Sequence, residues 1–347
     1  MTEILPKASS TRKKIITAIK FVFFLGLGLL IMWLSLKDLT ANERAEIMHS
    51  FRTANYYWVG LAIVLGVFSH ILRAARWVLF FEPMGFKPKL KTTFYAVMVG
   101  YFANMAFPRL GEVTRCGIMS RYEKVPFQKA LGTVVTERAI DMLIFFLLFL
   151  LMLFTQMGII SEYLNQNIYP KVVAKFGDLH YSRMIFLSLG GLLLVGILLW
   201  LAVRKKVKAS KTYIKITHLI IGFWEGLKSL SQVRKPGLFV LYSIAIWVLY
   251  FFMLYVIFFC FAETSLLSMG AGLSALELGS IGIMITPGGI GLYPAIIQET
   301  LLLYGIAKPT GLALGWIAWT AQTLMILIVG GLSLVLLSIK RSENGKA

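Results

Sequence analysis

The chain has 347 residues, of which 58% are hydrophobic and 15% charged, and its formal net charge is +19 at pH 7. Soluble domains carry roughly 25% charged residues, so this composition excludes an ordinary soluble globular protein and indicates an integral membrane protein. The basic residues flank the apolar runs and no soluble segment gathers them, which argues against nucleic acid and for anionic lipid headgroups as partners.

Eight apolar segments follow one another along the chain. A membrane-spanning helix needs about 20 apolar residues. Six segments meet this length and predict full crossings, at 15–36, 56–81, 127–154, 183–203, 238–262 and 311–338. Two others, at 92–122 and 266–305, are interrupted by Pro and Gly, and each predicts a re-entrant hairpin or a pair of short helices. The first crossing is too long for a cleaved signal peptide, so we expect it to be retained.

The two interrupted segments resemble each other. The first contains Pro108-Arg109-Leu110-Gly111, then Pro126 four residues before an Ala-Leu-Gly triplet. The second contains Pro287-Gly288-Gly289-Ile290-Gly291, then Pro309, also four residues before Ala-Leu-Gly. Paired helix breaks in corresponding places are typical of the binding sites of transporters at mid-membrane depth.

The distribution of Lys and Arg predicts the orientation. The segments 1–14, 82–91, 204–237 and 339–347 are rich in basic residues, whereas 37–55 and 155–182 are nearly balanced. The positive-inside rule therefore places both termini in the cytoplasm, in a protein of the inner (cytoplasmic) membrane.

These observations predict an all-α integral membrane protein, a polytopic helical bundle in one domain, 1–347. Two inverted repeats, 56–154 and 238–338, would flank a connecting helix at 183–203, and each repeat would contain one broken hairpin. Residues 209–230 predict an amphipathic helix that either lies in the cytoplasmic interface or packs against other protein.

Ionisable residues interrupt the apolar segments at a cost of at least about 2.5–3.5 kcal/mol each. We predict that they form a substrate-binding site with the two breaks. Its residues in the first half are Arg73, Arg76, Asn104, Arg109, Gly111, Glu112, Arg115, Glu137, Arg138 and Asp141. In the second half they are Pro287, Gly288, Gly289, Gly291 and Glu299.

The chemistry of these residues suits an anionic headgroup. The planar guanidinium of Arg donates paired hydrogen bonds to phosphate, and amides at a helix break add further donors. The carboxylates would balance the arginines and accept bonds from an amine or hydroxyl. The alternative is a structural lattice of ion pairs, or an Arg76 that only reaches toward the membrane surface.

The run from Asn104 to Arg115, followed by Thr136-Glu137-Arg138 and Asp141, resembles the flippase-like membrane domain of lysylphosphatidylglycerol synthases. The segments His70–Trp77 and Pro287–Gly291 share this resemblance, which extends from about residue 15 to 338. It implies movement of an aminoacylated phospholipid between leaflets, with amino-acid attachment carried out by a separate soluble domain.

Two departures from that family are visible. Only nine residues follow Ser338, so we expect no synthetase domain. The family places a Glu soon after the second break, whereas here Leu292-Tyr293-Pro294 follows and the next carboxylate is Glu299. The identity of the lipid is therefore left open.

The leading hypothesis is a lipid translocase for an anionic, aminoacylated or lipid-linked polar headgroup, not an enzyme. The alternatives are an integral-membrane enzyme that modifies a lipid-linked substrate, and a small-solute transporter. We find no catalytic motif, metal-ligand spacing or phosphate-binding loop, so we expect no catalytic residue, no metal and no cofactor. The expected partner is a membrane phospholipid or a lipid-linked substrate, and a homodimer is compatible with the sequence.

Overall fold

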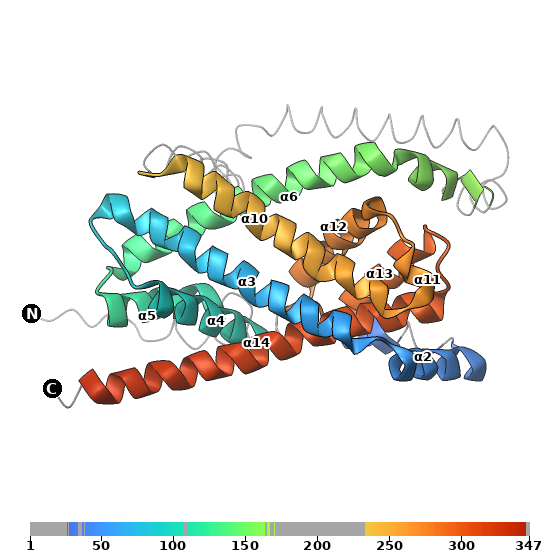
Figure 1. Cartoon of the computed structure of the whole chain (residues 1–347), viewed down its shortest axis with the longest axis horizontal. Helices are drawn as coiled ribbons and strands as arrows, with labels where there is room; N and C mark the ends of the chain where they lie inside the picture. The colour runs from blue at the N-terminus through green and yellow to red at the C-terminus, as the bar shows by residue number, and fades with distance from the viewer. Residues whose placement is uncertain are drawn as a thin grey trace, which may run out of the picture.

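The computed structural model describes residues 26, 28–33, 37, 39–106, 110–163, 165–166, 170 and 233–344 (Figure 1). These residues form helices and turns without a β-strand, which confirms the predicted all-α polytopic membrane fold. The predicted helices at 183–203 and 209–230, most of the run at 15–36, and Arg109 lie outside the described residues.

Four helices in the described part are long and apolar enough to cross a membrane. They are α3 (Tyr56–Phe81), α6 (Phe127–Tyr163), α10 (Pro236–Tyr255, continued by the 3-10 turn η4, Val256–Cys260) and α14 (Lys308–Asn344). The predicted limits of α3 are confirmed at both ends. The predicted ends of the other three helices are displaced, most of all for α6, which continues to Tyr163 because no Pro or Gly pair stops it where the apolar run ends.

Each interrupted segment forms two short helices. The first gives α4 (Leu90–Ala106) and α5 (Leu110–Glu123), and the second gives α12 (Met269–Ile285) and α13 (Leu292–Leu302). Both α4 and α12 have 17 residues, about 25 Å at 1.5 Å per residue, less than the roughly 30 Å of a bilayer core.

The second break has a clear local cause. Pro287 lacks an N–H and favours an extended residue before it, and Thr286 is extended, with φ −108° and ψ 149°. Three glycines then adopt positive φ, Gly288 at 62°, Gly289 at 74° and Gly291 at 71°, a region that side chains with a Cβ disfavour. The one-turn 3-10 helix η5 (Pro287–Gly289) forms there in place of a continuous α-helix.

Two small elements were not expected from the sequence. Helix α2 (Ala41–Thr53) begins with a capping box, in which Glu43 N–H donates to the Thr40 hydroxyl and Thr40 N–H donates to the Glu43 carboxylate. Helix α11 (Ala262–Ser265) is a single turn. Such polar helices do not show as apolar runs, although the Thr-x-x-Glu pattern at Thr40 indicates the start of α2.

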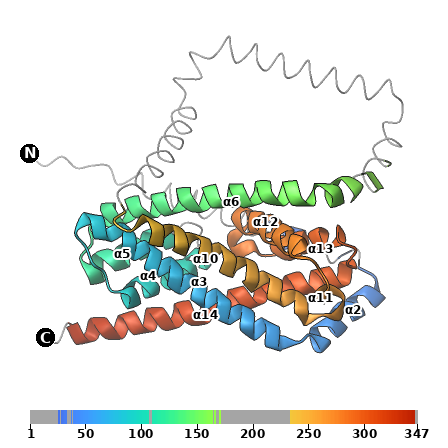
Figure 2. The same cartoon turned by 45° about the horizontal axis from the view of Figure 1, so that its top comes forward.

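The two halves of the described bundle have the same order of elements and run in opposite directions. In Figure 1, α3 and α14 run toward the end where the C-terminus lies, whereas α10 and α6 run away from it. The hairpin α4–α5 lies near the C-terminal end of the bundle, and α12–α13 lies near the opposite end, beside α2 and α11 (Figures 1 and 2).

Packing joins the two halves. Helix α3 packs along α10, α4 packs against α14, and α12 packs against α6, so each hairpin contacts the last long helix of the other half. Small residues permit these contacts: a Cβ on Gly330 of α14 would lie 2.8 Å from the Cβ of Phe102 in α4. Two buried apolar clusters result, one around Trp77 and Phe81 and the other around Phe258 and Ile297.

Candidate functional site

Five ionisable side chains from three helices meet in the interior of the bundle, and we call them the buried ion cluster. They are Arg73 and Arg76 of α3, Arg115 of α5, and Glu137 and Asp141 of α6. Arg76 and Glu137 are fully buried, and the other three are at most 8% exposed.

Asp141 and Glu137 each accept hydrogen bonds from more than one arginine. Asp141 accepts from Arg73 Nη2 at 2.6 Å and from Arg76 Nη2 at 2.7 Å. Glu137 accepts from Arg115 Nη2 at 2.8 Å and from Arg76 Nη2 at 3.3 Å. The two carboxylates are one helical turn apart on α6 and therefore share a face, as the spacing in the sequence predicts.

The buried ion cluster carries more positive than negative charge. Within the described residues, three guanidinium groups face two carboxylates, an excess of one positive charge. In addition, the Nε atom of each of the three arginines is buried without a hydrogen-bond partner in the part of the chain that the structure describes. Buried donors without acceptors are costly, so this arrangement favours an additional anion.

Aromatic side chains surround the guanidinium groups. The Arg115 guanidinium carbon lies 4.6 Å from the centroid of the Trp77 ring, and that of Arg73 lies 5.9 Å from the rings of Tyr101 and Tyr250. Trp77 is fixed by its own hydrogen bond, from Nε1 to the Thr133 hydroxyl at 2.9 Å. Cation–π attraction of this kind is strongest where water is excluded, and it holds the arginines in place.

A second ion pair lies between α5 and α6, closer to the surface. Arg138 Nη2 is 3.2 Å from Glu112 Oε1, and the two side chains are 46% and 24% exposed. Its position next to Arg115 and Glu137 along the same two helices makes this pair the outer neighbour of the buried ion cluster.

The first break brings α4 and α5 into close contact. The Asn104 side-chain oxygen accepts from the Gly111 N–H at 2.6 Å, across the break. A Cβ on Gly111 would collide with the carbonyl oxygen of Gly100, so only glycine permits this approach. Asn104, Gly111, Glu112 and Arg115 therefore lie in one compact pair of short helices.

The turn at the second break contacts the first interrupted segment. The 3-10 turn η5 contacts α4, the helix that leads into the first break. The Trp319 Nε1 donates to the Gly288 carbonyl oxygen at 2.7 Å, and Gly289 is buried whereas Gly288 is exposed. Glu299 is not part of the buried ion cluster: its side chain is exposed and accepts from Gln298 Nε2 at 3.0 Å.

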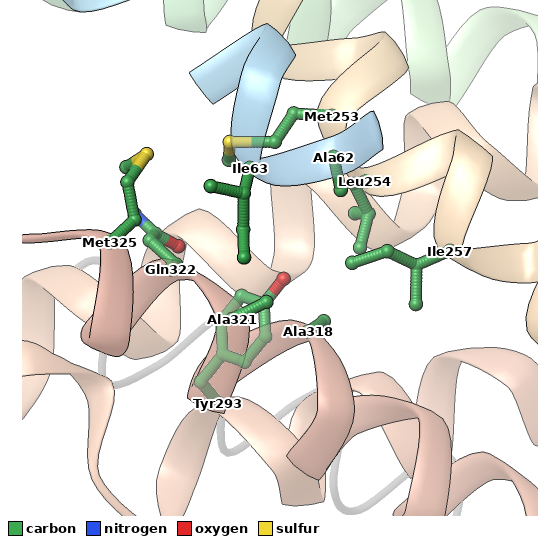
Figure 3. A pocket seen from close by; sticks show the side chains of 10 residues that line it. All are labelled: Ala62, Ile63, Met253, Leu254, Ile257, Tyr293, Ala318, Ala321, Gln322 and Met325. Carbon is green, nitrogen blue, oxygen red and sulfur yellow. The ribbon is translucent and has the colours of Figure 1, made fainter. Parts of the chain in front are cut away.

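A small apolar cavity of about 20 Å³ lies between α3, α10, α13 and α14. Its lining includes Ala62, Met253, Tyr293 and Met325, and Figure 3 shows the Tyr293 ring rising into it. A single water needs roughly 10–15 Å³, so this cavity is too small for a headgroup. In the present conformation the polar residues of the site are packed together.

Several neighbours of the site were not predicted from the sequence. The Ser243 hydroxyl of α10 accepts from Arg76 Nη1 at 3.2 Å, and Tyr101 and Tyr250 face Arg73. Serine and aromatic residues are common in membrane helices, so their types gave no signal. Glu277 of α12, a carboxylate within an apolar helix, is readable from the sequence as a polar residue near the second break, although it is not among the predicted substrate-binding residues.

Comparisons with known proteins agree with this architecture. A family model described as "Lysylphosphatidylglycerol synthase TM region" matches residues 17–330. A UPF0104 membrane protein of Methanocaldococcus jannaschii is 28% identical over 157 residues, and the match covers 44% of this chain and 44% of that relative. No solved structure matches the chain.

Proposed function

This chain belongs to the family of the lysylphosphatidylglycerol synthase transmembrane region, and from that premise we propose that it moves a phospholipid or lipid-linked substrate between leaflets. In this proposal, the anionic headgroup binds at the buried ion cluster while the acyl chains stay in the bilayer. The chain would act as a translocase, without covalent chemistry on the lipid.

One observation carries the proposal: the buried ion cluster has an excess of one positive charge, counted over the residues that the structure describes, and three unused Nε–H donors. A phosphate group would neutralise the excess and accept these hydrogen bonds. A purely structural lattice would gain more from equal numbers of the two charges, because each buried charge without a partner is costly.

The half-exposed pair of Arg138 and Glu112 would serve as the entrance. A phosphate that approaches between α5 and α6 would replace Glu112 as the partner of Arg138. It could then exchange onto Arg115, whose guanidinium is bound to Glu137 behind it. The close packing of the site would then represent a closed state that opens during transport.

The orientation of the predicted translocase follows from the basic residues. Lys87 and Lys89 lie in the connection between α3 and α4, Lys91 lies in the first turn of α4, and Arg234 precedes α10. In Figure 1 the end of α3 and the start of α10 lie at the end of the bundle where α14 ends. By the positive-inside rule, this end would face the cytoplasm, with the C-terminus, in the cytoplasmic membrane. The buried ion cluster would then be reached from the inner leaflet.

The test is lipid exchange in proteoliposomes. Purified protein would be reconstituted with fluorescent phosphatidylglycerol, and dithionite quenching would report the movement of lipid between leaflets. We expect Arg115→Lys to slow exchange by about tenfold, because the ammonium keeps the charge but loses the planar fork that binds phosphate. Arg138→Gln should slow exchange by a smaller factor.

Arg121→Lys is the matched control, since Arg121 is an exposed arginine on the same helix α5. It should exchange lipid at the wild-type rate. Equal rates for the wild type, Arg115→Lys and Arg138→Gln would reject the site, and no exchange above protein-free liposomes with any phospholipid or polyprenyl phosphate would reject the function.

A further inference from the structure

A second ionisable group lies in the other hairpin, far along the chain from the buried ion cluster. Glu277 is in the middle of α12, and its side chain is fully buried. Both of its carboxylate oxygens lack a hydrogen-bond partner among the residues that the structure describes, and no described basic side chain forms an ion pair with it.

The environment of Glu277 on the neighbouring helices is apolar or uncharged. From α13, the Tyr293 ring lies against Gly279, two residues after Glu277, and from α10 the Tyr255 ring lies against Gly272, five residues before it. From α6, Gln156 packs against Gly270, and η5 contributes only Pro and Gly. A carboxylate in these surroundings would lack any compensating charge, so the form that fits is the uncharged carboxylic acid.

A chain of hydrogen-bonded side chains leads from this helix toward the end of the bundle. Ser274 is one turn from Glu277 on the same face of α12, and its hydroxyl lies 2.7 Å from the Tyr304 hydroxyl. Tyr304 donates in turn to the Gln156 side-chain oxygen at 3.0 Å. Tyr304 is half-buried and precedes Gly305, which is exposed in the connection between α13 and α14.

We propose that Glu277 is a proton-binding site that exchanges its proton through Ser274 and Tyr304, and that this exchange is coupled to lipid movement. The coupling rests on the proposed function, whereas the proton site does not. In the step that releases the proton, the O–H bond of the carboxylic acid breaks. The proton passes through a bridging water and the two hydroxyls to bulk water, which becomes hydronium, and Glu277 is left as a carboxylate.

The chemistry of the site supports a proton over a metal ion. The part of the chain that the structure describes holds no group of three or more metal-ligating side chains. A metal cation also needs several oxygen ligands, whereas a proton needs one carboxylate. The position that corresponds to Glu277 in the first hairpin, ten residues before its proline, is Met98, so the proton site is specific to the second half.

The first experiment measures protonation alone. Infrared difference spectra of the purified protein should show the C=O band of a buried carboxylic acid, and Glu277→Gln should remove it. Glu263→Gln, which changes an exposed carboxylate of α11, is the control and should leave the band in place. Absence of the band from the wild type, or its persistence in Glu277→Gln, would overturn the proton site.

The second experiment measures coupling in the proteoliposome assay at a series of pH values. The wild-type rate of lipid exchange should change by up to about tenfold per pH unit, the limit for one proton. Glu277→Gln should still exchange lipid, but at a rate independent of pH, and Tyr304→Phe should respond more weakly than the wild type. The same pH dependence in the wild type and Glu277→Gln would overturn the coupling.

The two measurements keep the proposals apart. An infrared band that disappears in Glu277→Gln, together with no lipid exchange in any variant, would leave the proton site standing and reject the proposed function. Lipid exchange that depends on Arg115, together with no band from Glu277, would reject the proton site and leave the proposed function standing.

Discussion

The hairpin of α4 and α5 and the hairpin of α12 and α13 share a plan but differ in their polar groups. Each begins with a helix of 17 residues, and its sequence has a proline after that helix and a glycine eight residues before the proline, Gly100 and Gly279. The first hairpin contributes Arg115 to the buried ion cluster. The second contains the buried carboxylate Glu277, whose oxygens have no hydrogen-bond partner among the described residues.

This difference indicates that two hairpins with similar backbones need not carry the same polar side chains. A Cβ would be crowded at both matching positions, by the Gly111 backbone at Gly100 and by the side chains of Tyr293 and Ile297 at Gly279. We attribute the different charged residues of the two halves to different ligands. In the proposals above, the first half binds a phosphate and the second binds a proton.

The largest expected effect concerns the charge balance of the buried ion cluster. Glu137→Gln raises the excess positive charge from one to two, whereas Arg76→Gln removes the excess. We expect Glu137→Gln to lower the free energy of unfolding by about 3–5 kcal/mol, and Arg76→Gln to lower it by less, because breaking a buried pair leaves an uncompensated charge. Unfolding of the purified protein in detergent, followed by steric trapping, measures both.

The half-exposed pair supplies the control for this prediction. Glu112→Gln should cost less than about 1 kcal/mol, since the partner Arg138 is 46% exposed and an ion pair in contact with water contributes little. If Arg76→Gln were as costly as Glu137→Gln, the excess charge would have no energetic meaning and the phosphate proposal would lose its basis.

A smaller effect is expected where the two breaks use glycine differently. Gly111→Ala would place a methyl group against the Gly100 carbonyl oxygen and 2.7 Å from the Asn104 side chain. We expect a cost of about 3 kcal/mol from overpacking. Gly288→Ala meets nothing within 4 Å and is strained only by its φ of +62°, at about 1–2 kcal/mol.

Gly117→Ala is the control on the same helix as Gly111. A Cβ there meets nothing within 4 Å, so the higher helix propensity of Ala should raise stability by about 0.5–1 kcal/mol. A cost of Gly111→Ala no greater than that of Gly288→Ala would mean that α4 and α5 can separate without penalty.

The long helices were the most predictable part of the fold. The apolar run predicted both ends of α3 correctly, because Asn55 caps one end of the helix and the chain turns at Glu82 and Pro83 at the other. The predicted end of α6 at residue 154 was wrong, because the helix continues through the polar residues Gln156 and Glu162 after the apolar run stops. Polarity marks where a membrane helix leaves the lipid, and it does not mark where the helix ends.

The candidate site was predictable only through its charges. Arg73, Arg76, Glu137 and Asp141 were identified because a charge inside an apolar run is costly and needs a reason. Ser243 could not be identified, because serine satisfies itself within a helix by donating to a backbone carbonyl, as it does here to Phe239. Only the packing of α10 on α3 brings it to Arg76.

The smallest expected effects come from removing one side-chain hydrogen bond at each break. Asn104→Ala leaves the N–H of Gly111, a buried residue, without its acceptor and should cost about 1–2 kcal/mol. Trp319→Phe frees the carbonyl of Gly288, which is exposed, and should cost about 0.5–1 kcal/mol. Hydrogen exchange read by mass spectrometry should show faster exchange at α5 in Asn104→Ala and at residues 286–291 in Trp319→Phe. Faster exchange at both breaks in either variant would mean that the two hairpins open together, so that they behave as one mechanical unit in spite of their different chemistry.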